Sequence, residues 1–129
     1  MVGNGAAREN QVTAENAPRL QCRLIAEGAN GPISLEADAI LSTRLIPILP
    51  DILTNAGGVT VSYFEWVQDL GRLFWGRDEI RAKLAEKLND AFDRVWEISL
   101  EKNLTLRTSA LVAGIRDVGA ALEARGLYP

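Results

Sequence analysis

Residues 20–49 decide the fold of this 129-residue chain, and they read LQCRLIAEGANGPISLEADAILSTRLIPIL. Leu20, Cys22, Leu24 and Ala26 alternate with Gln21, Arg23 and Ile25, which predicts a β-strand over Leu20–Ala26. Glu27–Pro32 follows with two glycines, an asparagine and a proline, the composition of a turn. The predicted strand therefore ends in polar and conformationally permissive residues.

A helix and a second strand complete this unit. Ser34 is suited to cap a helix that runs from Leu35 to about Thr43, and Leu45–Leu49 predicts a short strand. A strand–helix–strand unit pairs its strands in parallel through a right-handed crossover. A two-stranded parallel sheet is small for a domain, so we expect the chain to be part of something larger or to assemble with a partner.

Three longer helices are predicted after this unit, over about residues 57–69, 78–100 and 106–125. Asp78 and Thr105 are the expected N-terminal caps of the last two helices. Apolar residues recur at helical spacing along both, which predicts a buried stripe on each. The first stripe comprises Ile80, Leu84, Leu88, Ala91, Val95 and Ile98, the second comprises Leu111, Ile115, Val118 and Leu122, and the expected surface ion pairs are Glu79–Lys83 and Asp90–Arg94.

Composition narrows the possible chemistry. The net charge is −3 and the basic residues are scattered among acids, so no nucleic-acid partner is predicted. The chain has no histidine, which excludes histidine-dependent triads, and its one cysteine, Cys22, excludes an internal disulfide; we predict no metal site. No apolar run is long enough to span a membrane. Residues 1–10 lack the apolar core of a signal peptide, and we expect them to be poorly ordered. A cytoplasmic protein fits this composition.

The segment over residues 55–66 reads NAGGVTVSYFEW and is the most informative candidate for a binding site. Asn55, Val59 and Ser62 stand at i, i+4 and i+7, so they are expected on one helix face beside two glycines. One interpretation is a binding surface, since glycine lets a ligand approach the backbone closely and a helix start attracts a carboxylate. The other is a buried glycine-rich helix start whose polar groups are satisfied internally.

The turn over Glu27–Gly31 is the second candidate, with Gly28, Asn30 and Gly31 at the carboxyl end of the first strand. Ligands of open α/β sheets bind outside such strand ends. A tight turn that needs glycine and asparagine for positive φ explains the same residues. Because the segment at Asn55 follows the second strand, we expect both candidates at one edge of the sheet.

These two segments carry a family resemblance. Ala26–Pro32 and Pro50–Trp66 resemble the C-terminal part of glutamate dehydrogenase, in the Glu/Leu/Phe/Val dehydrogenase family. The similarity runs from about Gln11 to the end of the chain, and SYFEW at residues 62–66 resembles the glutamate enzymes rather than the leucine or phenylalanine ones. It implies an α/β fold: the second half of a Rossmann-like dinucleotide-binding domain followed by C-terminal helices.

The resemblance also implies roles for the candidate residues. The parent reaction is oxidative deamination of L-glutamate to 2-oxoglutarate and ammonia, with hydride passed to NAD or NADP. Asn30 is implied beside the nicotinamide-side ribose, and Asn55 at the nicotinamide carboxamide or a nearby substrate group. Val59 and Ser62 are implied at the substrate, with Ser62 on its side-chain carboxylate. Cofactor contacts are thus expected at Gly28, Asn30, Gly31 and Asn55, and substrate contacts at Val59 and Ser62.

Parts of the family pattern have no counterpart in the sequence. The family's catalytic lysine and aspartate lie in an N-terminal substrate domain, and its glycine fingerprint precedes the region that matches here. We therefore assign no catalytic residue and expect the isolated chain to be inactive. Full-length members form homo-oligomers, and an alternative is a non-catalytic helical interaction module that docks onto a full-length subunit.

Overall fold

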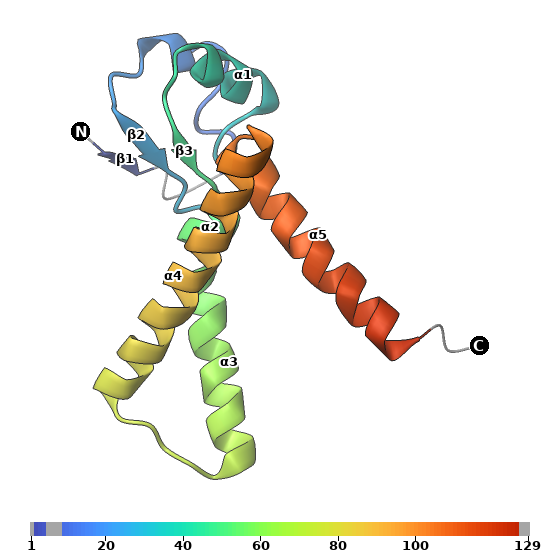
Figure 1. The fold of residues 1–129 in the computed structure, drawn as a ribbon. Coiled ribbons are helices and arrows are strands. Elements are labelled where there is room, and N and C mark those ends of the chain that lie inside the picture. The colour runs from blue at the N-terminus through green and yellow to red at the C-terminus, as the bar shows by residue number, and fades with distance from the viewer. Residues whose placement is uncertain (1, 5–8, 127–129) are drawn as a thin grey trace.

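The computed structural model describes residues 2–4 and 9–126, and it has a small sheet at one end and long helices at the other (Figure 1). Strands and helices alternate in the first part of the chain, and only helices follow. In chain order they are β1 (Val2–Asn4), the 3₁₀ helix η1 (Ala17–Arg19), β2 (Leu24–Ala26), α1 (Leu35–Thr43), β3 (Ile48–Leu49), α2 (Asp51–Thr54), α3 (Ala56–Gly71), α4 (Arg77–Lys102) and α5 (Leu106–Arg125).

The sheet has three parallel strands in the order β1-β2-β3, so the expectation of two strands is wrong. The additional strand, β1, lies in the segment that was expected to be poorly ordered; residues 1 and 5–8 of that segment lie outside the described residues. Gly3 is paired with Ile25, and Ile25 with Ile48. The α/β class is confirmed, with β2 as the central strand.

Both strands predicted from the sequence are shorter than expected. The Arg44 guanidinium donates hydrogen bonds to the carbonyl oxygens of Ala17 and Leu20, at 2.6 and 2.7 Å. The Leu20 carbonyl is thereby bound by a side chain rather than by a neighbouring strand, and β2 starts at Leu24. Pro47 has no N–H to donate to the sheet, and β3 begins only after it.

The predicted strand–helix–strand unit is confirmed around α1. Ser34 caps this helix, because its Oγ accepts a hydrogen bond from the Ala37 N–H at 3.2 Å. One face of α1 packs on the sheet and on η1, and these contacts form the first core cluster. Its buried members are Ala17, Ile25, Ile33, Ala37, Leu41 and Ile46.

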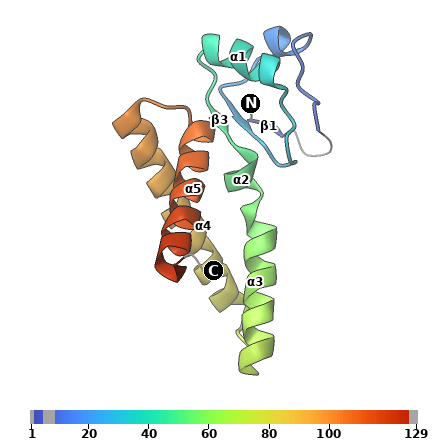
Figure 2. The ribbon, with the colours of Figure 1, turned by 90° about the vertical axis from the view of Figure 1, so that its right-hand side faces the viewer.

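The helices α3 and α4 form a hairpin that points away from the sheet, and α4 returns to the sheet where α5 begins (Figures 1 and 2). Asp78 is not the cap of α4. The helix starts one residue earlier, at Arg77, and Gly76, whose backbone is extended, is its N-cap. Asp78 instead lies inside the first turn, where the helix dipole favours a carboxylate. Thr105 is confirmed as the cap of α5, since its Oγ1 accepts from the Thr108 N–H at 3.2 Å.

The stripe predicted on α4 is confirmed, but the one predicted on α5 is wrong. All six apolar residues of the α4 stripe are buried or half-buried. On α5, the small residues Ser109, Ala110 and Ala113 face the protein instead, and Ala110 and Ala113 join Val95 and Ile98 in a second core cluster. Small side chains let α5 approach α4 closely, which turns the larger ones outward. The exposed residues are Leu111, Ile115, Val118 and Leu122.

Ion pairs on the helices also differ in part from expectation. Glu79–Lys83 is present, with an Oε1–Nζ distance of 3.6 Å. Arg94 does not turn to Asp90 but to Asp117 of α5, where Nη2 lies 2.7 and 2.9 Å from the two carboxylate oxygens. This pair links the outer faces of α4 and α5. Within the described ranges, no helix is both long enough and apolar enough to cross a membrane.

The first core cluster gives a test of the fold. Leu41 is 0% exposed and Leu45 is 89% exposed, although they are only four positions apart in the sequence. Leu41→Ala is expected to lower the free energy of unfolding by about 2–5 kcal/mol, because it leaves a cavity against the sheet. Leu45→Ala is the matched control and should cost less than about 1 kcal/mol. Urea unfolding followed by circular dichroism measures both; equal losses would contradict this assignment of the core.

Candidate functional site

The two segments selected from the sequence meet at the carboxyl edge of the sheet. Asn30 lies in the turn after β2, and Asn55 lies shortly after β3. The Asn55 Nδ2 donates a hydrogen bond to the Asn30 Oδ1 at 2.6 Å, across 25 positions of sequence. The expectation that both segments share one edge is therefore confirmed, and the two asparagine side chains are brought into direct contact.

Only one residue of the turn after β2 requires positive φ. Gly31 has φ +54°, whereas Gly28 and Asn30 have negative φ. The Gly31 N–H donates to the Asp51 Oδ2 at 2.8 Å, which ties the turn to the start of α2. Backbone geometry thus explains Gly31, while it does not require glycine at Gly28 or asparagine at Asn30.

Asn55 occupies the junction between α2 and α3 rather than a position inside a helix. Its φ is −102° and its ψ is 1°, and its side chain makes no capping hydrogen bond. Val59 and Ser62 follow on α3 with their side chains exposed, Val59 at 71%. Asn55, Ala56 and Gly57 are half-buried, whereas Gly58, Val59 and Ser62 are exposed, so solvent reaches this side of α3 from Gly58 onward.

The glycines beside Asn55 leave space at the start of α3. A Cβ atom added to Gly57 or to Gly58 would meet no heavy atom within 4 Å. Packing within the described chain therefore does not explain why both positions are glycine. Open backbone at a helix start suits a ligand that approaches closely, and the free N–H groups there favour a negative charge.

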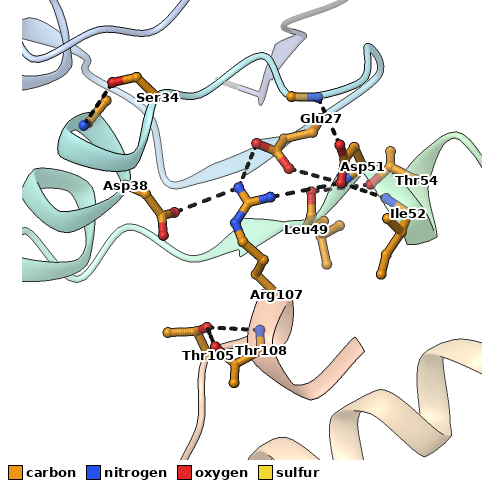
Figure 3. A network of polar contacts seen from close by, with 12 residues as sticks. Glu27, Ser34, Asp38, Leu49, Asp51, Ile52, Thr54, Thr105, Arg107 and Thr108 are labelled. Carbon is orange, nitrogen blue, oxygen red and sulfur yellow. Dashed lines mark hydrogen bonds and ion pairs between the residues drawn. The ribbon is translucent and has the colours of Figure 1, made fainter. Parts of the chain in front are cut away.

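A charged network lies directly beneath this edge (Figure 3). Glu27 is 0% exposed, and its Oε1 accepts a hydrogen bond from the Arg107 Nη2 at 2.7 Å. Its Oε2 accepts from the Asp51 N–H at 2.9 Å. A buried carboxylate is stable only where donors compensate for lost hydration, and both oxygens of Glu27 have one.

Three carboxylates converge on the single Arg107 guanidinium, which projects from the start of α5 (Figure 3). Asp38 of α1 lies 3.7 Å from Nη2 and Asp51 lies 3.8 Å from Nη1, in addition to the hydrogen bond with Glu27. Burial disfavours the charge of Arg107, but the hydrogen bond and charge of Glu27, with the charges of Asp38 and Asp51, raise its pKa above the usual value. The guanidinium therefore stays protonated throughout the working pH range.

Arg107, Glu27 and Asp51 were not selected from the sequence as site residues, yet two signals mark them. Arg107 stands in the first turn of a helix, where the dipole disfavours a cation, so a carboxylate partner in the tertiary structure is expected. Glu27 directly follows an apolar strand, which places a charge at the boundary of the core. What no local pattern indicates is that these two residues, 80 positions apart, are partners.

The fold of the chain matches that of solved glutamate dehydrogenases. The structure of glutamate dehydrogenase from Peptoniphilus asaccharolyticus matches 95% of the chain with a TM-score of 0.90 and 40% identity, and 31% of that protein is covered. The hetero-hexameric glutamate dehydrogenase from Thermus thermophilus, in a leucine-bound form, matches 99% with a TM-score of 0.94 and 34% identity, again over 31% of its length.

The relatives found by sequence comparison are also glutamate dehydrogenases. Glutamate dehydrogenase of Thermotoga maritima is 48% identical over 124 residues, which cover 96% of this chain and 30% of the relative. The NAD-specific enzyme of Clostridioides difficile is 46% identical, and the NADP-specific enzyme of Synechocystis is 45% identical; the chain covers 29% and 28% of them, respectively. The profile of the Glutamate/Leucine/Phenylalanine/Valine dehydrogenase family matches residues 5–126. The chain belongs to this family, and it spans about 30% of the length of these relatives.

From this network we expect Arg107 to contribute more than Arg94 to the free energy of unfolding. Arg107→Met removes the charge that compensates the buried Glu27, and we expect the free energy of unfolding to fall by about 3 kcal/mol. Arg94→Met is the matched control, because its pair with Asp117 is exposed on both sides and exposed pairs contribute about 0–1 kcal/mol. Urea unfolding of both variants measures the difference; equal losses would show that Glu27 is compensated without Arg107.

Proposed function

We propose that this chain forms the C-terminal part of the cofactor-binding unit of a glutamate dehydrogenase, which oxidises L-glutamate to 2-oxoglutarate and ammonia with NAD or NADP. In this proposal the three parallel strands are the second half of a Rossmann-like dinucleotide-binding domain. The observation that carries it is the contact of Asn30 with Asn55 at the carboxyl edge of the sheet. Ligands of such sheets bind at this edge.

The paired asparagines suit the nicotinamide end of the cofactor. An amide side chain has both donors and an acceptor, and so matches the donors and acceptor of a carboxamide. In the proposal Asn55 binds the nicotinamide carboxamide, Asn30 lies by the adjoining ribose, and Gly28 and Gly31 let the turn approach the cofactor. The names of the NAD-specific and NADP-specific relatives support the cofactor class.

The open start of α3 suits the substrate. The Ser62 hydroxyl can donate to the side-chain carboxylate of glutamate, and Val59 offers an apolar contact to its methylene groups. The space beside Gly57 and Gly58 supports close approach of a ligand to this helix. The cofactor supplies the hydride chemistry, so the residues of this chain bind and orient rather than react.

The proposal assigns the proton-transfer chemistry to sequence outside this chain. The family's catalytic lysine and aspartate and its glycine fingerprint have no counterpart among these residues, and the chain spans only about 30% of its relatives. We therefore expect the isolated chain to be inactive and the activity to need the rest of such a polypeptide, in an oligomer. The hexameric Thermus structure supports an oligomer; a homo-oligomer and a cytoplasmic location stay predictions.

A chimera tests the function directly. The part of Thermotoga maritima glutamate dehydrogenase that matches this chain is replaced by residues 5–126, and glutamate-dependent reduction of NAD and NADP is measured. Activity in the chimera, with none in the 129-residue chain alone, is the expected result. A folded oligomeric chimera that binds neither cofactor would contradict the proposal.

Ser62→Ala in this chimera tests the substrate contact. Loss of a hydrogen bond to a charged group is expected to lower kcat/KM for glutamate by about 10–100-fold, with little change in the KM of the cofactor. Thr60→Ala is the matched control, because the Thr60 hydroxyl already donates to the Ala56 carbonyl within α3 at 2.8 Å. If both variants lose the same activity, Ser62 has no special role at the substrate.

The exposed apolar residues favour a second candidate function, a non-catalytic module that docks onto a full-length subunit. Ile52 of α2 and the outer face of α5 line an open groove of about 440 Å³. Apolar surface of this kind on a soluble chain generally marks a contact with another protein. The residues of the groove are Ile52, Ala110, Leu111, Gly114, Ile115, Val118, Gly119 and Leu122.

Association measurements distinguish this second candidate. A module that docks through the groove should associate with a full-length family member, and Ile115→Lys should weaken that association at least about tenfold by placing a charge on the apolar surface. Ala120→Lys adds the same charge at an exposed position outside the groove and is the control. Light scattering in which the 129-residue chain remains a folded monomer, separate from the full-length protein, would exclude docking.

A further inference from the structure

We propose that Arg107 is a positioning residue for the asparagine pair, and that it acts through Glu27 and Asp51. The proposal rests on the proposed function, in which Asn30 and Asn55 receive the cofactor. It assigns a role at the binding edge to the first turn of α5, a helix whose remaining length runs away from that edge (Figures 1 and 3).

The first link is Glu27, which joins the end of β2 to the start of α2. Its backbone N–H donates to the Leu49 carbonyl at 3.1 Å, so its main chain is fixed in the sheet. Its side chain accepts from the Asp51 N–H at 2.9 Å and from Arg107 at 2.7 Å. The position of Asp51 is thus set by a buried carboxylate whose own placement depends on Arg107.

The second link is Asp51, which holds both asparagine-bearing segments. Its Oδ2 accepts from the N–H of Gly31, the residue after Asn30, at 2.8 Å. Its carbonyl oxygen accepts from the Asn55 N–H at 2.9 Å. A displacement of Asp51 would therefore change the separation of Asn30 and Asn55, whose side chains contact one another at 2.6 Å.

Arg107 provides the charge that keeps Glu27 and Asp51 together. Two carboxylates at the boundary of the core repel one another, and a guanidinium with several N–H donors can serve both at once. A lysine at this position would keep the charge but would lack the planar set of donors. The contribution of Arg107 to the edge is thus expected to depend on the shape of the side chain and not only on its charge.

A purely structural role makes a different prediction. If Arg107 only attached α5 to the sheet, its replacement would loosen α5 and leave the turn at Gly31 and the side chain of Asn55 unchanged. The distinguishing readout is therefore local to the edge. Two signals report on it: hydrogen exchange of the Gly31 amide, and the chemical shifts of the Asn55 side-chain amide.

The experiment records ¹⁵N–¹H spectra of the 129-residue chain without ligand. The variants are Arg107→Lys and Arg107→Met. Arg94→Met is the control, because Arg94 of α4 forms its ion pair with Asp117 of α5, ten residues beyond Arg107. Glu27→Gln is a fourth variant, which keeps an acceptor for the Asp51 N–H and removes the charge. If Arg107→Met does not fold, Glu27→Gln and Arg107→Lys still test the proposal.

The expected result is a graded effect confined to the edge. Protection of the Gly31 amide should fall at least about tenfold in Arg107→Met, less in Arg107→Lys, and not in Arg94→Met, while amides in the middle of α4 keep their protection. The Asn55 side-chain amide should shift in the same order. Wild-type values for Gly31 and Asn55 in folded Arg107→Lys and Glu27→Gln would overturn the proposal.

Titration with NAD separates this proposal from the proposed function. If the wild-type signals of Asn30 and Asn55 do not respond to NAD or NADP, either in the 129-residue chain or in the chimera with the Thermotoga maritima enzyme, the cofactor assignment fails. The measurements without ligand would still show whether Arg107 places the pair. In a chimera that is active, Arg107→Lys is expected to raise the KM of the cofactor more than it lowers kcat, and Arg94→Met should change neither.

Discussion

The buried carboxylate of Glu27 is the constraint on which the arrangement of this protein depends. This carboxylate is excluded from solvent at the end of the central strand, so hydrogen-bond donors must replace its lost hydration. The donors are the guanidinium of Arg107 on α5 and the N–H of Asp51. Satisfying this one group fixes where α2 starts and where α5 meets the sheet. The asparagine pair is a consequence of the same arrangement, because Asp51 holds the segments on which Asn30 and Asn55 lie.

This polar link matters because the apolar contacts of the chain fall into two separate clusters. One lies between α1 and the sheet, and the other lies between α4 and α5. The network around Arg107 connects them, with Asp38 on the side of the first cluster and Arg107 beside the second. Substantial apolar surface remains outside both, on α3 and on the outer face of α5. Such surface is what a part of a larger assembly presents, and the chain spans about 30% of its relatives.

The candidate site was predictable from the sequence in its location but not in its construction. The carboxyl ends of parallel strands share an edge, so the turn at Asn30 and the segment at Asn55 had to lie near one another. The direct contact between the two asparagines depends on side-chain orientation, and it became visible only with Asn55 at the junction of α2 and α3. The residues beneath the edge escaped prediction, because the partnership of Glu27 and Arg107 spans most of the chain.

Local features follow from the amino-acid sequence alone: the caps at Ser34 and Thr105, the strand–helix–strand unit and the buried stripe of α4. Each depends on residues within a few turns of one another, where periodicity and hydrogen-bonding side chains act directly. Two outcomes arise from the packing of distant elements: a third strand pairs with β2, and α5 buries Ser109, Ala110 and Ala113 instead of its larger apolar residues. Those outcomes depend on how closely two distant elements approach and on which buried charge must be compensated, and no local pattern contains that information.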